Sequence, residues 1–340
     1  VDVATIILNK NIIQNNNVEI LENIMEDFYH LYSIKQNNWI SDENNTFNLK
    51  PELTLRSDNC VTLGDLASIT FGLQTKDKSQ FVSEIKKEAD WEPCYTGSDI
   101  SRYYLKDSKL FFKNNFKEVK AGGSWDMSKH HSKKIVVRQI GGPEPIFAFD
   151  EHSFASLNTM YNIVLNESSN YHYYYLMSIL NSKLIKVYWI SKFSDSKQLF
   201  PKIKAFQLKQ IPIPQKNLIS QQPLILITEL MLELNKQLQN KAKIFHNRIK
   251  SNFALEKIST KLESFYEHDF KTFVAELKKQ KAMLSLKQQD EWEEYFNSYK
   301  KEINQLQTEI EKTDKEIDQM VYGLYGLTEE EIRIVEGSVR

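Results

Sequence analysis

The spacing of apolar and polar positions changes along this chain of 340 residues and divides it into three regions. Residues 58–216 contain short runs of β-branched and aromatic residues between turn signals, which predicts strands. In residues 217–340 apolar residues recur at alternating steps of three and four, which predicts long helices. Residues 1–57 are too short for a domain, and we interpret them as the end of an upstream domain with a connector. We therefore expect an α+β fold with a helical C-terminal part.

The strands expected in the central region form a mixed sheet. Residues 60–69 predict a strand and a short helix, and four further runs predict strands. These runs are SKLFFK, KKIVVRQI, IFAFD and TMYNIVL. Upstream, Val3–Leu8 predicts a strand, and residues 23–32 predict a short helix. The face of that helix would carry Ile24, Phe28, Leu31 and Tyr32.

A predicted core helix, a basic loop and a proline-rich stop close the central region. Residues 171–190 have the apolar spacing of one buried helical face. The loop that follows carries Lys192, Lys197, Lys202 and Lys204 against the single acid Asp195, and the segment LKQIPIP then restricts the backbone. A cationic loop held on a rigid base favours a polyanion as ligand.

The C-terminal part predicts an antiparallel helical hairpin, because two apolar seams each need a partner. Its arms are expected at roughly residues 220–250 and 290–322, with shorter helices between them. Gly323 and Gly326 are expected to end the second arm, and Thr328 with Glu331 has the spacing of a capping box for a last helix.

Charge is unevenly distributed although the formal net charge is only -1. Residues 97–142 contain ten Lys and Arg against four Asp and Glu, whereas residues 288–336 contain fourteen acids against five bases. A nucleic-acid interface would therefore have to be local. The two cysteines, the lack of a secretory leader and the short apolar runs favour a cytoplasmic protein without membrane contact. Because the chain begins at Val1 and enters an apparent interior strand, we expect a piece of a longer protein.

Catalytic and metal-binding motifs do not emerge from the sequence. A glycine-rich cofactor loop, an Asn/Asp-Pro-Pro-aromatic tetrapeptide and a Walker loop do not occur. Asp77, Glu84 and Lys86 imitate a nuclease constellation only loosely, and solvated surface explains them better. His130 and His131 have no ligand partner at metal spacing. We expect no catalytic residue and no metal in this chain.

An ordered series of short motifs resembles the TaqI-like C-terminal specificity domain, or target recognition domain, of adenine-specific DNA methyltransferases and type IIG restriction-modification enzymes. The similarity covers roughly residues 58–336, and the order and spacing of the motifs carry it. The motifs are TFGLQT, CYTGSDISRYYL, KKIVVRQI, TMYNIVL, LMSILNSKLIKVYWI and LKQIPIP. The tail KTDKEIDQMVYGLYGLTEEEIRIVE is similar to the helical end of such proteins.

The resemblance implies three domains: the end of a methyltransferase domain with a connector (1–57), a target recognition domain (58–216) and a helical spacer (217–340). It implies double-stranded DNA as a partner, and a methyltransferase domain of the same polypeptide or a separate modification subunit as another. S-adenosylmethionine and adenine methylation, and in some such enzymes DNA cleavage, would then belong to residues outside this chain.

The candidate DNA contacts combine cations for phosphates with amides and hydroxyls for base edges. Ordinary alternatives stand beside them: a solvated loop for Lys192 and Lys197, a cross-strand pair on the sheet for Arg138 and Gln139, and core packing for Tyr103 and Tyr104. The candidates are Gln74, Thr75, Lys76, Lys78, Arg102, Lys129, His130, Arg138, Gln139, Lys192, Ser194, Lys197, Gln198 and Lys202.

Two other functions are compatible with the same pattern. One is the specificity subunit of a type I restriction-modification system, which normally has two recognition domains and two helical spacers where one of each is expected here. The other is a coiled-coil module that binds protein and not DNA, which the acidic tail and near-zero net charge favour.

Overall fold

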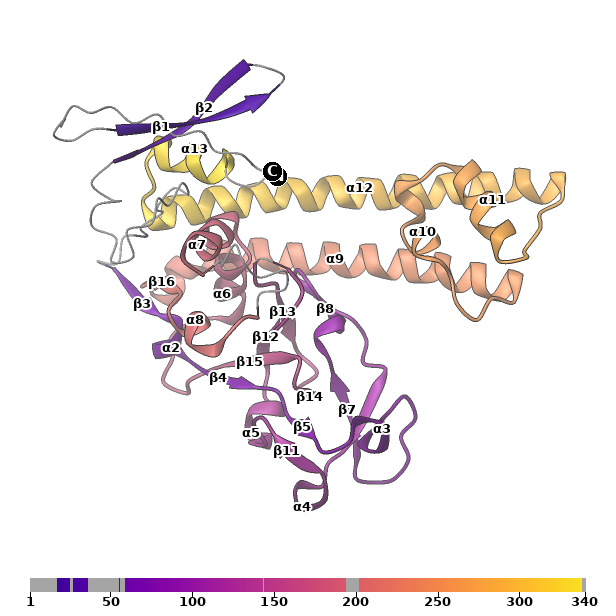
Figure 1. Ribbon diagram of the computed structural model, residues 1–340, viewed down its shortest axis with the longest axis horizontal. Helices are drawn as coiled ribbons and strands as arrows, with labels where there is room; N and C mark the ends of the chain where they lie inside the picture. Colours follow the sequence, from indigo (N-terminus) through magenta and orange to yellow (C-terminus); the bar gives the residue numbers. More distant parts are fainter. Residues whose placement is uncertain are drawn as a thin grey trace.

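The computed structural model of the protein describes residues 17–24, 27–35, 55, 59–142, 144–193 and 202–337. It consists of a region of small sheets with short helices, followed by two long helices that extend beyond the sheets (Figure 1). The expected α+β class is thereby confirmed. Among the described helices, none combines the length and apolar character that a membrane crossing requires.

A four-stranded antiparallel sheet lies at the centre of the first region, in the order β13-β12-β15-β4. Ile135, Val136 and Val137 of β12 are all buried, because both faces of this sheet are covered. Ile135 and Val137 face the core shared with the helices, while Val136 faces a smaller cluster on the other side. The strands are β4 (Ala67–Phe71), β12 (Lys134–Arg138), β13 (Phe147–Asp150) and β15 (Met160–Leu165).

A second, mixed sheet forms an outer lobe in the order β14-β7-β10-β6, with β14 and β7 parallel. Its strands are β6 (Val82–Ser83), β7 (Trp91–Tyr95), β10 (Leu110–Lys113) and β14 (Ala155–Ser156). Two short ribbons form separate pairs: β5 (Gln74–Thr75) with β11 (Lys120–Gly122), and β8 (Ile100–Ser101) with β9 (Tyr104–Leu105). The second ribbon contacts β12 and β13 of the central sheet. Between these strands lie α3 (Lys78–Phe81), η1 (Gly97–Asp99), α4 (Phe116–Val119) and α5 (Met127–His130).

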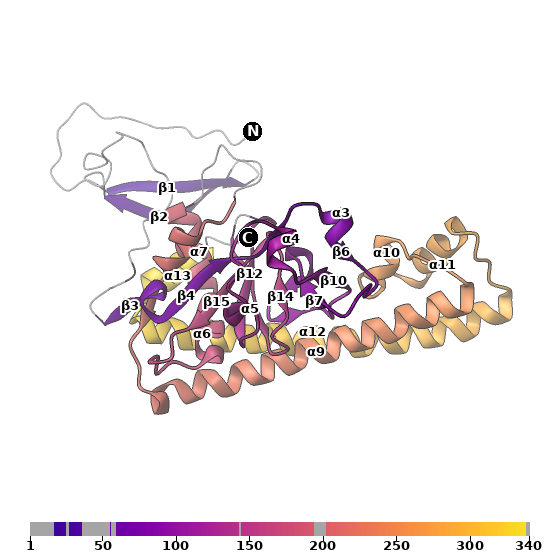
Figure 2. The same cartoon turned by 90° about the horizontal axis from the view of Figure 1, so that it is seen from below.

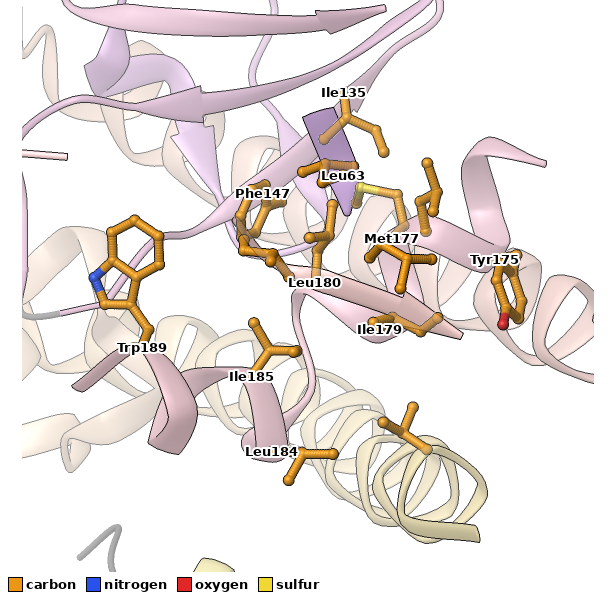
Figure 3. Packing of buried hydrophobic residues seen from close by; sticks show 14 of the residues in the cluster. Leu63, Ile135, Phe147, Tyr175, Met177, Ile179, Leu180, Leu184, Ile185 and Trp189 are labelled. Atoms are coloured by element: carbon orange, nitrogen blue, oxygen red, sulfur yellow. The ribbon is translucent and has the colours of Figure 1, made fainter. Parts of the chain in front are cut away.

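The single helix expected over residues 171–190 is two helices, α6 (Tyr173–Leu180) and α7 (Lys183–Phe193). The break falls at Asn181, whose side-chain amide donates to the carbonyl of Phe147 and accepts from its N–H, each at 3.1 Å. Apolar spacing did not reveal this break, because the bonds that stabilise it come from β13. Figure 3 shows apolar side chains of α6 between Ile135 and Phe147 of the sheet and Leu184 and Ile185 of α7.

The proline-rich stop after the basic loop forms β16 (Pro212–Pro214), which pairs with β3 (Cys60–Thr62). Two short helices, α2 (Leu63–Leu66) and α8 (Ala205–Lys209), pack beside this pair. Tyr175 of α6 donates to the carbonyl of Pro214 at 3.0 Å. The expected strand and short helix at residues 60–69 are thus confirmed. They pack against β16 and α8, at the end of the central region.

The expected antiparallel hairpin is confirmed by α9 (Leu218–Phe253) and α12 (Leu286–Tyr325), which lie side by side in both views (Figures 1 and 2). At its far end three short elements cover the helices: α10 (Thr260–Glu263), η2 (Phe265–Glu267) and α11 (Phe270–Lys279). Helix α12 ends at Gly326, whose φ of +63° suits glycine, so the stop expected at Gly323 lies inside the helix. The Thr328–Glu331 capping box begins α13 (Glu329–Gly337).

The helix expected over residues 23–32 was wrong. The chain forms an antiparallel β-hairpin there, β1 (Asn17–Ile24) and β2 (Asp27–Lys35). Apolar residues in a short segment satisfy helical and strand spacing almost equally, and pairing with an upstream strand decides between them. The expected strand Val3–Leu8 lies outside the described residues.

Candidate nucleic-acid interface

Five chain segments meet at one end of the central sheet. Arg138 at the end of β12 pairs with Met160 of β15, and the next residue of β15, Tyr161, pairs with Phe71 at the end of β4. The N–H of Gly97 donates to the hydroxyl of Thr159 at 2.8 Å. The N–H of Ile203 donates to the carbonyl of Gln139 at 2.9 Å. We call this end of the sheet the rim and define it by residues 72–78, 96–99, 138–142, 159 and 202–204.

The rim presents cations and hydrogen-bonding side chains to solvent. Seven of the sequence candidates lie in it: Gln74, Thr75, Lys76, Lys78, Arg138, Gln139 and Lys202. Two acids accompany them, and each is held by local hydrogen bonds: Asp77 accepts from Ser79, and Asp99 accepts from Thr96. The bonds from Ser79 lower the pKa of Asp77, so it remains charged at neutral pH. Cations nonetheless outnumber acids among the described rim residues, counting Lys204 as well.

Arg102 lies elsewhere and has its donors occupied. Its two terminal nitrogens donate to the two carboxylate oxygens of Asp314 in α12, at 2.7 and 2.6 Å. Its Nε donates to the carbonyl of Asn181 at 3.1 Å. This bidentate pair ties the sheet region to the helical hairpin. We therefore remove Arg102 from the candidate DNA contacts.

His130 is fully buried and is also removed from the candidates. Its Nδ1 accepts from the N–H of Ser156 at 3.1 Å, and its Nε2 lies 3.0 Å from the carbonyl of Ser124. Burial lowers the pKa of His130, so the ring is neutral at pH 7 and Nε2–H donates to that carbonyl. The ring therefore joins α5 to the sheet, a role that the sequence did not indicate.

Two further candidates that the structure describes, Lys129 and Lys192, are not in the rim. Lys129 is half-buried on α5, which packs against β14 and β15. Lys192 is exposed at the end of α7, where its ammonium donates to the hydroxyl of Tyr188 at 2.9 Å. Ser194, Lys197 and Gln198 lie outside the described residues, and their contact with DNA stays a prediction.

Sequence inspection missed several rim residues. The exposed Ser98 and Lys204 and the hydroxyl of Thr159 were not among the candidates. The sequence does hold a signal for Ser98, because a glycine at position 97 favours a turn there. Lys204 was noted only as part of the basic loop. Its proximity to Gln139 depends on a hydrogen bond between segments that are more than sixty residues apart.

A pocket of about 420 Å³ lies where the sheet region meets α12. Among its lining residues, Asp318 is buried and accepts from the N–H of Lys183, at the start of α7, at 2.8 Å. Burial raises the pKa of Asp318 to about 7, while that hydrogen bond opposes the shift. The described residues contain no group of three or more His, Cys, Asp or Glu side chains placed to hold a metal ion.

Asp318 should make the protein less stable as the pH rises. Its folded pKa lies above that of an unfolded aspartate, so the folded state binds more protons between about pH 4 and 7, and stability falls across this window. Asp318→Asn keeps the oxygen that accepts from Lys183 but carries no charge. We expect it to raise the free energy of unfolding at pH 8 by on the order of 2 kcal/mol, and by less at pH 5. Urea denaturation at both pH values measures this.

The exposed Glu316→Gln is the matched control, two residues away on α12, and should change stability little at either pH. An Asp318→Asn variant that is destabilised at pH 8, or equally stabilised at both pH values, would contradict the assignment.

The comparisons with known families give a match to the TaqI-like C-terminal specificity domain over residues 92–213, which contain most of the central sheet and much of the rim. This chain contains a TaqI-like C-terminal specificity domain. The specificity domain is followed by a match over residues 217–321 to a domain of unknown function (DUF8810), which covers α9 and most of α12.

A curated relative comes from Methanocaldococcus jannaschii and is named as a type II restriction enzyme and methyltransferase. It is 27% identical over 209 residues, which make up 56% of this chain and 16% of the relative. The chain thus spans about a sixth of the length of that protein. The specificity domain is therefore related to restriction-modification enzymes.

Solved structures with a similar fold include the type IIL restriction-modification enzyme MmeI in complex with DNA, at 11% identity and a TM-score of 0.42, with 94% of this chain and 40% of MmeI covered. The HsdS subunit from Thermoanaerobacter tengcongensis matches at 12% identity and a TM-score of 0.34, over 63% of this chain and 44% of HsdS. A type I S subunit from M. genitalium matches at 15% identity and a TM-score of 0.35, over 64% of this chain and 52% of that subunit. These likenesses are too weak to transfer a function.

Proposed function

We propose that this chain recognises a specific sequence in double-stranded DNA for an adenine-specific DNA methyltransferase or a combined type II restriction-modification enzyme. The observation that carries the proposal is the rim. Five segments, four of them within the matched residues 92–213, bring exposed cations together with amides and hydroxyls at one end of the central sheet. A surface of this composition suits duplex DNA, because cations bind phosphates and the shorter polar groups bind base edges.

Different side chains of the rim suit phosphate contacts and contacts to base edges. Lys76, Lys78 and Lys202 are exposed on flexible stems and suit phosphate contacts. Gln74 and Gln139 carry side-chain amides that can donate and accept at the same base edge. Because all five lie on segments anchored to one sheet, the protein would present them to DNA with little rearrangement.

Methyl transfer would take place outside this chain. A methyltransferase domain of the same polypeptide, or a separate modification subunit, would bind S-adenosylmethionine and flip the adenine, and cleavage would need a further nuclease domain. The hairpin offers a surface for such a protein partner. Ile219, Leu226 and Leu230 are 85%, 56% and 50% exposed along one stripe of α9. That stripe also favours the second candidate function, a helical spacer of a type I specificity subunit.

Binding should be sequence-specific and should weaken steeply with salt. We expect a randomised duplex library, titrated with the chain at 50 and 200 mM salt, to yield an enriched motif. Lys78→Ala and Lys202→Ala should each reduce the slope of log K against log salt by about 0.9 without changing the motif, because each removes one phosphate contact.

Lys301→Ala is the control, an exposed lysine on α12 away from the rim, and should leave the slope unchanged. Enrichment of no motif at either salt concentration would refute sequence-specific recognition. Equal effects of the rim and control variants would show that any binding is non-specific.

A further inference from the structure

Three of the ten glycines in the chain surround the side chain of Arg138. A Cβ atom on Gly141 would lie 2.5 Å from Nε and 2.6 Å from Cζ of Arg138, and one on Gly97 would lie 3.2 Å from its Cβ. Gly142 approaches Nη2 from the same loop, with 3.7 Å between that nitrogen and its Cβ position. The φ angles of Gly141 and Gly142 are +145° and +154°, which side chains rarely permit. Backbone therefore packs against the side chain of Arg138, and at Gly141 any larger residue would displace the guanidinium. We call Gly97, Gly141 and Gly142 the glycine cradle.

The cradle fixes the guanidinium but leaves most of its donors unused. Nη2 donates to the carbonyl of Gly141. Nε is buried without a hydrogen-bond partner, and Nη1 makes no hydrogen bond to the described part of the chain. A guanidinium has five N–H donors in a planar fork, and a donor left unpaired costs free energy that a ligand can recover. The side chain remains partly exposed at the end of β12.

Arg102 has a structural role in this protein, and its hydrogen-bond partners differ from those of Arg138. All three of its nitrogens donate to protein oxygens, and a carboxylate, that of Asp314, neutralises it. No such carboxylate pair is found for Arg138 among the described residues. Both arginines are thus contacted by protein atoms, but only Arg102 is paired with a carboxylate.

We propose that Arg138, oriented by the glycine cradle, reads a guanine in the recognised sequence through a bidentate contact to O6 and N7. The inference rests on the proposed DNA-recognition function and adds the base and the residue that reads it. Guanine presents two acceptors side by side in the major groove, which match two N–H groups of the guanidinium. A phosphate contact needs only charge, which the flexible rim lysines supply, whereas base reading needs a fixed direction. The cradle supplies that direction.

The test is motif selection from a randomised duplex library by the 340-residue chain and by two variants. Arg138→Lys keeps the charge but loses the planar fork, and Gly141→Ala keeps the arginine but pushes it out of the cradle. We expect the wild type to select a motif with at least one fixed guanine. Both variants should relax the preference at one such position by about 5- to 150-fold, with the other positions unchanged. Circular dichroism and thermal unfolding establish that each variant is folded, and Arg138→Lys is decisive if Gly141→Ala does not fold.

The outcomes separate this inference from the function on which it rests. If the wild type selects no motif, the proposed DNA recognition fails and the guanine assignment fails with it. If the wild type selects a motif but both folded variants keep every preference, only the assignment of Arg138 is overturned. Uniform weakening at all positions, as expected for Lys202→Ala, would make Arg138 a phosphate contact and would also overturn it.

Discussion

Replacing Asp150 with alanine should lower the free energy of unfolding by about 3 to 5 kcal/mol. Its carboxylate lies 2.6 Å from the ammonium of Lys134, and both side chains are completely buried between β12 and β13. The other carboxylate oxygen accepts from the N–H groups of His152 and Ser153, each at 3.0 Å. Burial lowers the pKa of Lys134 and Asp150 opposes that shift, so the variant leaves an ammonium without its counter-charge.

Urea denaturation of Asp150→Ala measures the loss, and Asp107→Ala is the control. Asp107 also pairs with a lysine at 2.6 Å, but the two side chains are 71% and 59% exposed, so its removal should cost no more than about 1 kcal/mol. The double variant Asp150→Ala, Lys134→Met should recover part of the loss, since the buried charge is gone. Similar losses for Asp150→Ala and Asp107→Ala would show that burial of the pair is not what stabilises the sheet.

Replacing Phe245 with alanine should destabilise the outer end of the helical hairpin by about 3 to 5 kcal/mol. The ring of Phe245 is fully buried and stacks on Phe265 with 3.7 Å between centroids and on Tyr295 with 5.6 Å. Phe273, Trp292 and Phe296 complete the ring cluster. This cluster belongs to a core separate from the one under the sheet.

Hydrogen exchange should show which elements lose stability in the Phe245→Ala variant. Amides of α11 and the outer turns of α9 and α12 should exchange faster in Phe245→Ala, while those of β12 and β15 should keep their protection, because their core is not touched. Ile244→Ala is the matched control, since the neighbouring side chain on α9 is 51% exposed. Faster exchange throughout the sheet would mean that the two cores unfold as one unit.

Sequence patterns predicted the hairpin well because its stabilising contacts repeat along the chain. Leu224, Met231, Leu234, Leu238 and Phe245 recur at steps of three, four and seven along α9 and are all buried, while Ile227 at the same spacing is half-buried. The strand at residues 134–138 was likewise predicted, because Ile135, Val136 and Val137 form a β-branched run. In both cases the deciding residues are close together in sequence.

Prediction failed where a distant segment decides the local structure. The break at Asn181 depends on Phe147, and Asp27–Lys35 forms a strand because the upstream segment Asn17–Ile24 pairs with it. Among the candidate contacts, Arg102 and His130 had the right chemistry for DNA, but Asp314 and Ser156 occupy them. Composition identifies which groups a side chain can bind. It does not identify which of its donors and acceptors already have partners within the folded protein.

The sequence by itself determined the α+β class, the antiparallel helical hairpin and the residue types from which the proposed DNA-binding surface is built. Only the tertiary structure decided which cations share one surface and which are already paired with groups of the protein itself. The physical reason is that local spacing encodes which face of an element is buried, whereas the direction and free donors of a side chain depend on its neighbours in space. Arg138 and Arg102 are alike in sequence terms, and only the glycines around one and the carboxylate beside the other distinguish them.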